Sequence, residues 1–183
     1  MSKENADKEQ KRSFKREVFS WIACIVVTIL LTEFILNFVI INANIPSGSM
    51  ENTIMTNDKL IALRTSYWFN DPKRGDIIIF KYPDDETEWF IKRVIALPGE
   101  TVLVKDGKVY INGSKKALSE PYIKEEPVED FGPYKVPKIG YFVMGDNRNN
   151  SNDAREWETH YVSRDEVLGK AWFRYYPSIK VIK

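Results

Sequence analysis

An uninterrupted apolar run at residues 18–41, VFSWIACIVVTILLTEFILNFVII, limits what this chain can become more than any other feature. About 20 apolar residues are enough to cross a bilayer as a helix. A cleaved signal peptide is the alternative, but its apolar core usually spans about 7–15 residues. Because the run is longer than that, we favour an uncleaved transmembrane anchor.

Glu33 is the one charged residue within this run. A charge at the centre of a spanning helix costs about 2.5–3.5 kcal/mol on insertion scales. Each Leu, Ile, Val or Phe contributes about 0.3–0.6 kcal/mol in the other direction, and the run holds more than a dozen of them. The apolar sum therefore outweighs the charge, and the sequence favours no functional role for Glu33.

The segment before the run sets the expected orientation. Residues 1–17 are polar and charged, and they predict a solvated tail without stable structure. Its basic residues adjoin the apolar run and place the N-terminus in the cytoplasm by the positive-inside rule: Lys11, Arg12, Lys15 and Arg16. We therefore predict a cytoplasmic tail (1–17), a single-pass anchor in the cell membrane (18–41) and an extracytoplasmic domain (42–183).

Composition excludes several classes of protein. The chain of 183 residues carries 27 Lys and Arg against 26 Asp and Glu, a net charge of +1, whereas a nucleic-acid-binding domain usually has a clear basic excess. The single cysteine, Cys24, lies inside the apolar run and forms no internal disulfide. With one Cys and one His in the chain, a zinc site is not expected, and we predict neither metal nor cofactor.

The remainder of the chain has a pattern of short runs and turns that is typical of a β protein. Short runs rich in β-branched and aromatic residues alternate with turns, and Asp106-Gly107 is a strong hairpin signal. The expected strands lie within 58–64, 74–83, 88–100, 101–113, 140–147 and 169–177. Residues 163–170 suggest one helical turn, and the Pro- and Glu-rich residues 118–140 an extended surface excursion. We therefore predict a mainly β domain, an antiparallel sheet or partly closed barrel.

Two serines follow the anchor directly, in the stretch IPSGSM at 45–50. A serine becomes a nucleophile only when a base removes its proton, and the candidate bases are His160 and the lysines. A lysine base must be neutral, although the ordinary pKa of lysine is about 10.4, so it has to be buried among apolar groups. Lys92, in WFIKRVIAL, has such neighbours. Lys92 and Arg93 point to opposite faces of a strand, so one occupies the more buried face; a solvated Lys92 at a sheet edge is the alternative.

Three motifs occur in order after the anchor: IPSGSM, FIKRVIALPGE and GDNRNNSNDAR. In this respect the chain closely resembles bacterial type I signal peptidases, membrane-bound serine endopeptidases with a Ser–Lys dyad, in their single-anchor Gram-positive style. The resemblance implies that signal-peptide-bearing preproteins are cleaved after small residues, the A-x-A pattern. It also implies membrane lipid as a contact and the secretion machinery as a possible partner.

The resemblance assigns roles to individual residues. Ser49 would be the nucleophile and Lys92 the general base, while the Ser49 N–H and the Ser47 hydroxyl would form the oxyanion hole. Ser151 matches the serine that orients the lysine. The supporting ion-pair group would comprise Arg93, Asp153 and Arg155, and the shaping turn Gly145, Asp146, Asn147 and Arg148. Shallow substrate pockets would be lined by Ile45, Met50, Ile54, Phe90 and Ile91.

Some residues depart from the family pattern. Asn52 stands where proline is usual, and Ala154 where a serine is common, which removes a hydroxyl beside Arg155. His160 lies in the unusual segment REWETHYV, and a Ser–His pairing there is the mechanistic alternative to the dyad. Tyr67, Trp68 and Phe69 form an aromatic cluster that would either meet lipid headgroups or pack in the core.

Two other functions stay open at this point. The first is a Ser–Lys self-cleaving peptidase of the repressor type, which the long anchor argues against because such proteins are soluble and carry a DNA-binding segment. The second is a membrane-tethered β module that binds partners without catalysis. The combined presence of Ser49, Lys92 and Ser151 argues against mere binding.

Overall fold

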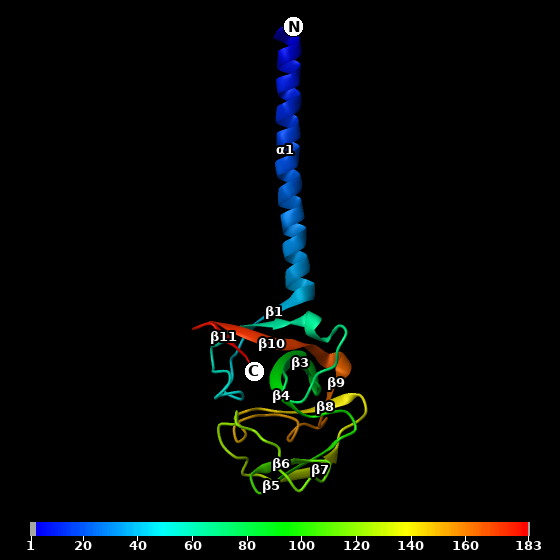
Figure 1. Ribbon diagram of the computed structural model, residues 1–183, viewed down its shortest axis with the longest axis vertical. Helices are drawn as coiled ribbons and strands as arrows, with labels where there is room; N and C mark the ends of the chain where they lie inside the picture. The colour runs from blue at the N-terminus through cyan, green and yellow to red at the C-terminus, as the bar shows by residue number, and fades with distance from the viewer. Residues whose placement is uncertain (1–2, 183) are drawn as a thin grey trace. The chain divides into compact units, whose positions relative to one another are not determined.

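The computed structural model describes residues 3–182. The chain divides into two compact units, Met1–Val39 and Ile40–Lys183. The first unit is helical and the second is built almost entirely from antiparallel strands (Figure 1). The mainly β fold and the single apolar N-terminal helix predicted from the sequence are thus confirmed.

The first unit is α1 (Lys3–Phe34), followed by a π-helical turn, η1 (Ile35–Val39). Residues Phe14–Val39 have a mean hydropathy of 2.4 over the most apolar window and are a candidate membrane span by length and composition. Helix α1 begins at Lys3, so the prediction that the N-terminal tail lacks stable structure is wrong for residues 3–17. These residues contain neither Gly nor Pro and are rich in Lys, Glu, Gln and Arg, which propagate a helix well.

Polar groups within the apolar helix are satisfied locally. The side-chain amide of Asn37 donates to Glu33 Oε2 at 3.1 Å and to the Glu33 carbonyl oxygen at 2.8 Å. The Thr28 hydroxyl donates to the Cys24 carbonyl oxygen at 2.8 Å. Glu33 is therefore not an isolated charge, because an amide one turn away binds its carboxylate.

The second unit is organised around one large sheet with strand order β1-β2-β10-β3-β4-β8-β9, with β11 pairing β10. Its strands are β1 (Ile40–Asn44), β2 (Lys59–Leu63), β3 (Ile77–Tyr82), β4 (Asp85–Ala96), β8 (Gly140–Met144), β9 (Val162–Ser163), β10 (Val167–Tyr176) and β11 (Lys180–Val181). Every pairing is antiparallel. The path is open, since its end strands β1 and β9 are not paired with each other in the described chain.

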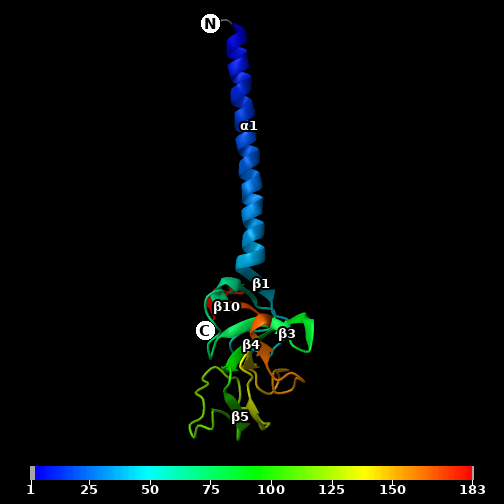
Figure 2. The same ribbon diagram turned by 90° about the vertical axis from the view of Figure 1, so that its right-hand side faces the viewer.

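A smaller sheet joins β5 (Thr101–Lys105), β6 (Lys108–Ile111) and β7 (Phe131–Lys135) in the order β6-β5-β7. Both views place it at the end of the second unit away from β1 and β10 (Figures 1 and 2). The predicted hairpin turn is present, with positive φ at Asp106 and Gly107, as a type I′ turn requires. Strand β7 lies within 118–140, so part of that excursion is sheet.

Strand β3 shows how the large sheet buries both of its faces. All four residues Ile77, Ile78, Ile79 and Phe80 are buried. Because side chains alternate along a strand, Ile78 and Phe80 pack into one apolar cluster and Ile77 and Ile79 into another. Residues 91–96 of the neighbouring strand β4 are likewise buried on both faces.

Two local elements differ from the sequence prediction. Ile40 and Ile41, the last residues of the apolar run, belong to β1 and pair with Leu63 and Ala62. The helical turn predicted within 163–170 is a short 3₁₀ helix, η3 (Arg164–Glu166), capped by Ser163. A second 3₁₀ helix, η2 (Arg64–Tyr67), follows β2. It buries Tyr67 but leaves Trp68 and Phe69 exposed, so the aromatic cluster is divided between core and surface.

Candidate active site

The two serines of IPSGSM lie in the loop that joins β1 to β2. This loop is closed at its base, where the Ile45 N–H donates to the Asp58 carbonyl oxygen and the Asn57 N–H to the Ile45 carbonyl oxygen. Inside it, the Glu51 N–H donates to the Gly48 carbonyl oxygen at 3.1 Å. The serines are therefore held on a compact turn.

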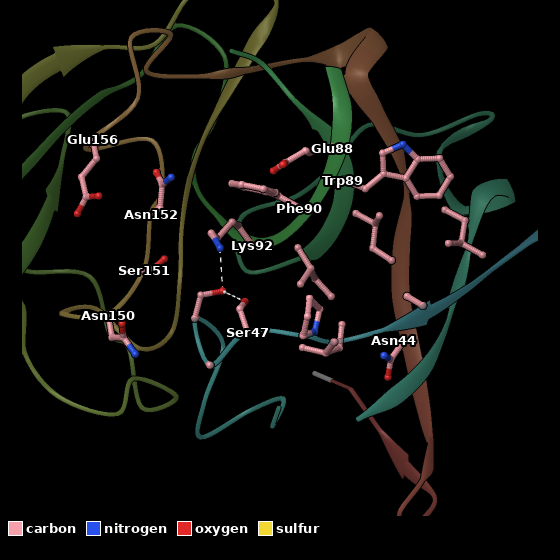
Figure 3. Close-up of a pocket in the computed structure, with 18 of the residues that line it drawn as sticks. Asn44, Ser47, Glu88, Trp89, Phe90, Lys92, Asn150, Ser151, Asn152 and Glu156 are labelled. Atoms are coloured by element: carbon pink, nitrogen blue, oxygen red, sulfur yellow. Dashed lines mark hydrogen bonds between the residues drawn. The ribbon is translucent and has the colours of Figure 1, made fainter. Parts of the chain in front are cut away.

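Lys92, on β4, contacts Ser49, in the loop between β1 and β2. Lys92 Nζ lies 2.8 Å from Ser49 Oγ, and Ser47 Oγ lies 3.3 Å from Ser49 Oγ (Figure 3). Lys92 is 4% exposed and Ser49 6% exposed, so the contact is shielded from water. The fold thus brings together two residues that are 43 positions apart in the sequence.

Burial changes the chemistry of the Lys92 amine. Desolvation lowers the pKa of Lys92 from 10.5 to about 8; Asp153 raises this pKa, Arg155 lowers it and Glu156 raises it, each by a smaller amount. At pH 7 about a tenth of a group with pKa 8 is neutral, several hundred times the fraction for an ordinary lysine. The amine is thus poised to accept a proton near neutral pH.

Lys92 and Arg93 occupy opposite faces of β4, but both are buried. Neither side chain lies on a clearly more buried face, because β4 lies beside β3, which has apolar clusters on both sides. Lys92 is paired in register with Ile78 and Arg93 with Ile77. The charge of Arg93 is compensated by Asp146, whose two oxygens accept from Arg93 Nε at 2.8 Å and Nη2 at 2.7 Å.

The supporting side chains form two ion pairs. Arg93 pairs with Asp146, and Asp153 pairs with Arg155 at 2.8 Å. The Asp153 carboxylate also accepts from the Gly145 N–H at 2.9 Å. The shaping turn is thereby tied to β4 on one side and to the following loop on the other.

The turn at 145–148 presses against the nucleophile. A Cβ at Gly145 would collide with the Ser49 carbonyl oxygen and with the Ser151 hydroxyl, so glycine is required by close approach. The Asn147 N–H donates to the Ser49 carbonyl oxygen at 3.0 Å. Arg148 is fully buried and makes two hydrogen bonds to Glu120, at 2.9 and 2.6 Å.

Ser151 is placed beside the dyad but does not make the expected hydrogen bond. Its residue lines the same cavity as Ser49 and Lys92, and its buried hydroxyl has no hydrogen-bond partner among the described residues. An orienting role through a direct bond to Lys92 Nζ is therefore absent from this conformation.

A cavity of about 920 Å³ opens next to the two serines. Its lining comes from three strands and two loops: residues 41–49, Ile79, residues 88–92, residues 149–152 and Glu156. Of the predicted pocket residues, Ile45, Phe90 and Ile91 line it. Met50 and Ile54 do not, because the turn folds them inward against Leu60, Ala62 and the other residues of a buried cluster.

Sequence reasoning missed the contribution of residues 118–130. The Tyr122 ring stacks on the Arg93 guanidinium, whose central carbon lies 3.8 Å from the ring centroid. Lys124 Nζ pairs with Glu51 Oε2 at 2.8 Å. The side chain of Asn52, a departure from the family pattern, donates to the Tyr122 carbonyl oxygen at 2.9 Å. No local signal predicts these contacts, since Glu51 and Asn52 lie 73 and 70 residues from their partners and Arg93 lies about 30 residues from Tyr122.

His160 is not part of this cavity. Its Nδ1 lies 2.8 Å from the Ala154 carbonyl oxygen, and its ring packs against Phe131 and Tyr134. His160 is partly buried rather than a surface residue. A Ser–His pairing has no support in this geometry. Among the described residues, no group of three His, Cys, Asp or Glu side chains is arranged to hold a metal.

Comparison with known proteins gives one consistent result. The family model described as signal peptidase, peptidase S26, matches residues 18–176. A probable signal peptidase I-2 from Synechocystis is 44% identical over 161 residues, covering 85% of this chain and 72% of that one. A signal peptidase I from Bacillus amyloliquefaciens is 34% identical, covering 96% and 97%. A crystal structure of a signal peptidase I from Enterococcus faecalis is 36% identical and covers 55% of this chain and 97% of its own, with a TM-score of 0.48.

Proposed function

This chain belongs to the signal peptidase family, peptidase S26, and we propose that it works through a Ser49–Lys92 dyad and cleaves after small residues. As a member of that family, it is a serine endopeptidase that acts on preproteins bearing signal peptides. The observation that carries this proposal is the buried 2.8 Å contact between Lys92 Nζ and Ser49 Oγ. A neutral Lys92 takes the Ser49 proton as Oγ attacks the scissile carbonyl carbon, and the resulting ammonium then protonates the leaving amine.

The developing negative charge needs hydrogen-bond donors. Ser47 Oγ lies beside Ser49 Oγ, and the Ser49 N–H donates to no acceptor in the described part of the chain. These two groups are free to bind the oxyanion of the tetrahedral intermediate. One such donor is commonly worth about 2.7–4 kcal/mol of transition-state stabilisation.

Two unpaired strand edges offer a binding mode for the substrate. Within the described chain β1 pairs only with β2, and residues 85–92 of β4 pair only with β3. Both segments line the cavity, so an extended peptide can add its backbone hydrogen bonds to them. Alternate side chains of that peptide would meet Ile45, Phe90 and Ile91, which leave room for small residues.

The remaining residues of the site support the dyad. The Arg93–Asp146 and Arg155–Asp153 pairs, together with Arg148, hold the 145–153 segment against Ser49 and Lys92. Ser151 would orient the lysine once the amine moves or a substrate fills the cavity. These roles rest on position and burial.

The apolar span implies attachment to a membrane, and the basic residues before it favour a cytoplasmic N-terminus. We therefore propose a tail at 1–17, an anchor at 18–41 and a peptidase domain at 42–183 outside the cytoplasm, where it would meet preproteins leaving the secretion machinery. Trp68 and Phe69, which are 54% and 90% exposed, are suited to lipid headgroups.

A cleavage assay tests the proposal directly. The purified full-length protein in detergent should cut a preprotein after an A-x-A site, and Ser49→Ala and Lys92→Ala should each abolish the cut. His160→Ala is the control and should retain activity. Activity retained in Lys92→Ala would remove the proposed base, and cutting after large residues would remove the proposed specificity.

A further inference from the structure

We infer that Asn147 is a positioning residue for the oxyanion hole, acting through the peptide unit that joins Gly48 to Ser49. This inference rests on the proposed function, because it assumes that the Ser49 N–H binds the oxyanion. Asn147 is 1% exposed, does not line the cavity, and touches neither Lys92 nor the Ser49 hydroxyl by any hydrogen bond in the described chain.

The orientation of a peptide unit is fixed when either of its ends is held. A trans peptide is planar, so the carbonyl of Gly48 and the N–H of Ser49 point in opposite directions. Asn147 Nδ2 donates to the Gly48 carbonyl oxygen at 2.9 Å. By holding that oxygen, Asn147 turns the Ser49 N–H away from itself, while the N–H has no acceptor among residues 3–182.

A second bond from the same residue fixes the next peptide unit. The backbone N–H of Asn147 donates to the Ser49 carbonyl oxygen at 3.0 Å. Asn147 therefore holds the carbonyl groups on both sides of the Ser49 Cα, through its side chain on one and its backbone on the other. Rotation of Ser49 about its own backbone would break one of these bonds.

The neighbouring charges decide which end of the Asn147 amide faces the loop. Glu51 Oε2 lies 3.5 Å from Asn147 Nδ2 and is held in place by Lys124. With two acceptors on that side, the NH₂ group must face Gly48 and the oxygen must face away. That oxygen is buried without a partner in the described chain. A buried oxygen without a hydrogen bond is unfavourable, and a purely structural role for Asn147 does not explain it.

The Gly48 carbonyl oxygen also accepts from the Glu51 N–H at 3.1 Å. Loss of the Asn147 donor therefore loosens the peptide unit without releasing it. Since removal of a whole oxyanion donor lowers kcat by about 10²–10³, we expect a smaller loss of about 10- to 100-fold from Asn147→Asp, which keeps the shape and the backbone N–H but removes the NH₂ donor. Asn147→Ala removes the same donor without adding charge.

The measurements separate positioning from general damage. For both variants in the full-length protein, kcat should fall with KM within about twofold. For Asn147→Ala, which adds no charge near Lys92, the pH midpoint of the reaction should stay that of wild type. A peptide aldehyde is the probe of the hole: Ser49 Oγ adds to the aldehyde carbon, its proton passes to Lys92 Nζ, and the carbonyl oxygen becomes the oxyanion. Affinity for the aldehyde should fall in proportion to kcat/KM, while affinity for the matching peptide alcohol should not change.

Asn70→Asp, which adds the same charge on the surface, is the matched control and should behave as wild type. Equal losses for aldehyde and alcohol, a shifted pH midpoint in Asn147→Ala, or retained kcat would each overturn the inference. Should both variants fail to fold, a structure of the wild-type aldehyde adduct decides: the oxyanion must lie on the Ser49 N–H with Asn147 Nδ2 still on the Gly48 oxygen. A wild-type protein that cuts no preprotein would instead count against the proposed function.

Discussion

Replacing Lys92 with methionine should abolish cleavage and yet stabilise the fold at neutral pH. Methionine has a similar length and volume but no charge, and volume-conserving apolar changes in a core are tolerated well. Lys92 is almost fully buried, and burial lowers its pKa from 10.5 to about 8. A lowered lysine pKa means that the folded state disfavours the ammonium, so the charged form destabilises the protein.

The magnitude follows from the two pKa values. With 10.5 in the unfolded chain and about 8 in the folded one, the penalty is about 3 kcal/mol at pH 7 and less than about 1 kcal/mol at pH 10. Between these values the unfolded chain binds more protons than the folded one, so the free energy of unfolding of the wild type rises with pH. The methionine variant also loses the hydrogen bond to Ser49, worth about 1 kcal/mol, and its net gain at pH 7 is about 2 kcal/mol.

Equilibrium unfolding in denaturant, followed by tryptophan fluorescence in detergent, measures this difference at pH 7 and pH 10. The advantage of Lys92→Met over wild type should shrink by about 2–3 kcal/mol between the two pH values, a difference in which the hydrogen-bond contribution cancels. Lys108→Met, on the exposed strand β6, is the control and should show no such pH dependence. An advantage that is absent at pH 7, or that is the same at both pH values, would refute the claim that Lys92 is buried at an energetic cost.

Two further changes test the surroundings of the dyad. Glu156 raises the pKa of Lys92, so Glu156→Gln should move the rising alkaline limb of the pH–rate profile to lower pH. Glu158→Gln, in the same loop but outside the cavity lining, should not move it, and a limb that moves to higher pH would contradict the assigned sign. Gly145→Ala forces a methyl group against the Ser49 carbonyl oxygen and the Ser151 hydroxyl, and should lower both kcat and the free energy of unfolding, the latter by about 1–3 kcal/mol. Gly113→Ala, with open space around it but a positive φ, should cost stability and leave kcat unchanged.

The parts of the fold that could be predicted from sequence are those with local causes. The hairpin at Asp106 and Gly107 follows from the backbone conformation that this turn needs, and β3 from a run of β-branched residues. Strand β1 could not be separated from the anchor, because Ile40 and Ile41 are as apolar as the helix before them and a continuous apolar run has no period to distinguish strand from helix. Pairing with β2 decides their structure, and that contact is not local.

The candidate site divides in the same way. Ser49 and Lys92 could be named because each sits in a distinctive stretch, but their neighbours depend on tertiary contacts. Arg93 pairs with Asp146, 53 residues away in the sequence, and Arg148 pairs with Glu120, 28 residues away. Nothing in the Glu-rich stretch around Glu120 marks one carboxylate as buried and the rest as solvated. Likewise, Met50 and Ile54 have the composition of pocket residues and the burial of core residues, and only the path of the turn decides between the two.

The charges around Lys92 oppose one another, which shows what sets its pKa. Asp153 raises that pKa and Arg155, its ion-pair partner, lowers it, so the pair contributes little as a unit. The Phe90 ring, 5.3 Å from Nζ, attracts the ammonium, and this attraction raises the pKa. Desolvation is the dominant cause of the lowered pKa, and Phe90 belongs to the apolar wall that keeps water from the amine. In the proposed mechanism the same wall limits the size of the substrate side chain. Enlarging the pocket to admit larger residues would admit water to the amine as well, so the preference for small residues and the activation of the base depend on one surface.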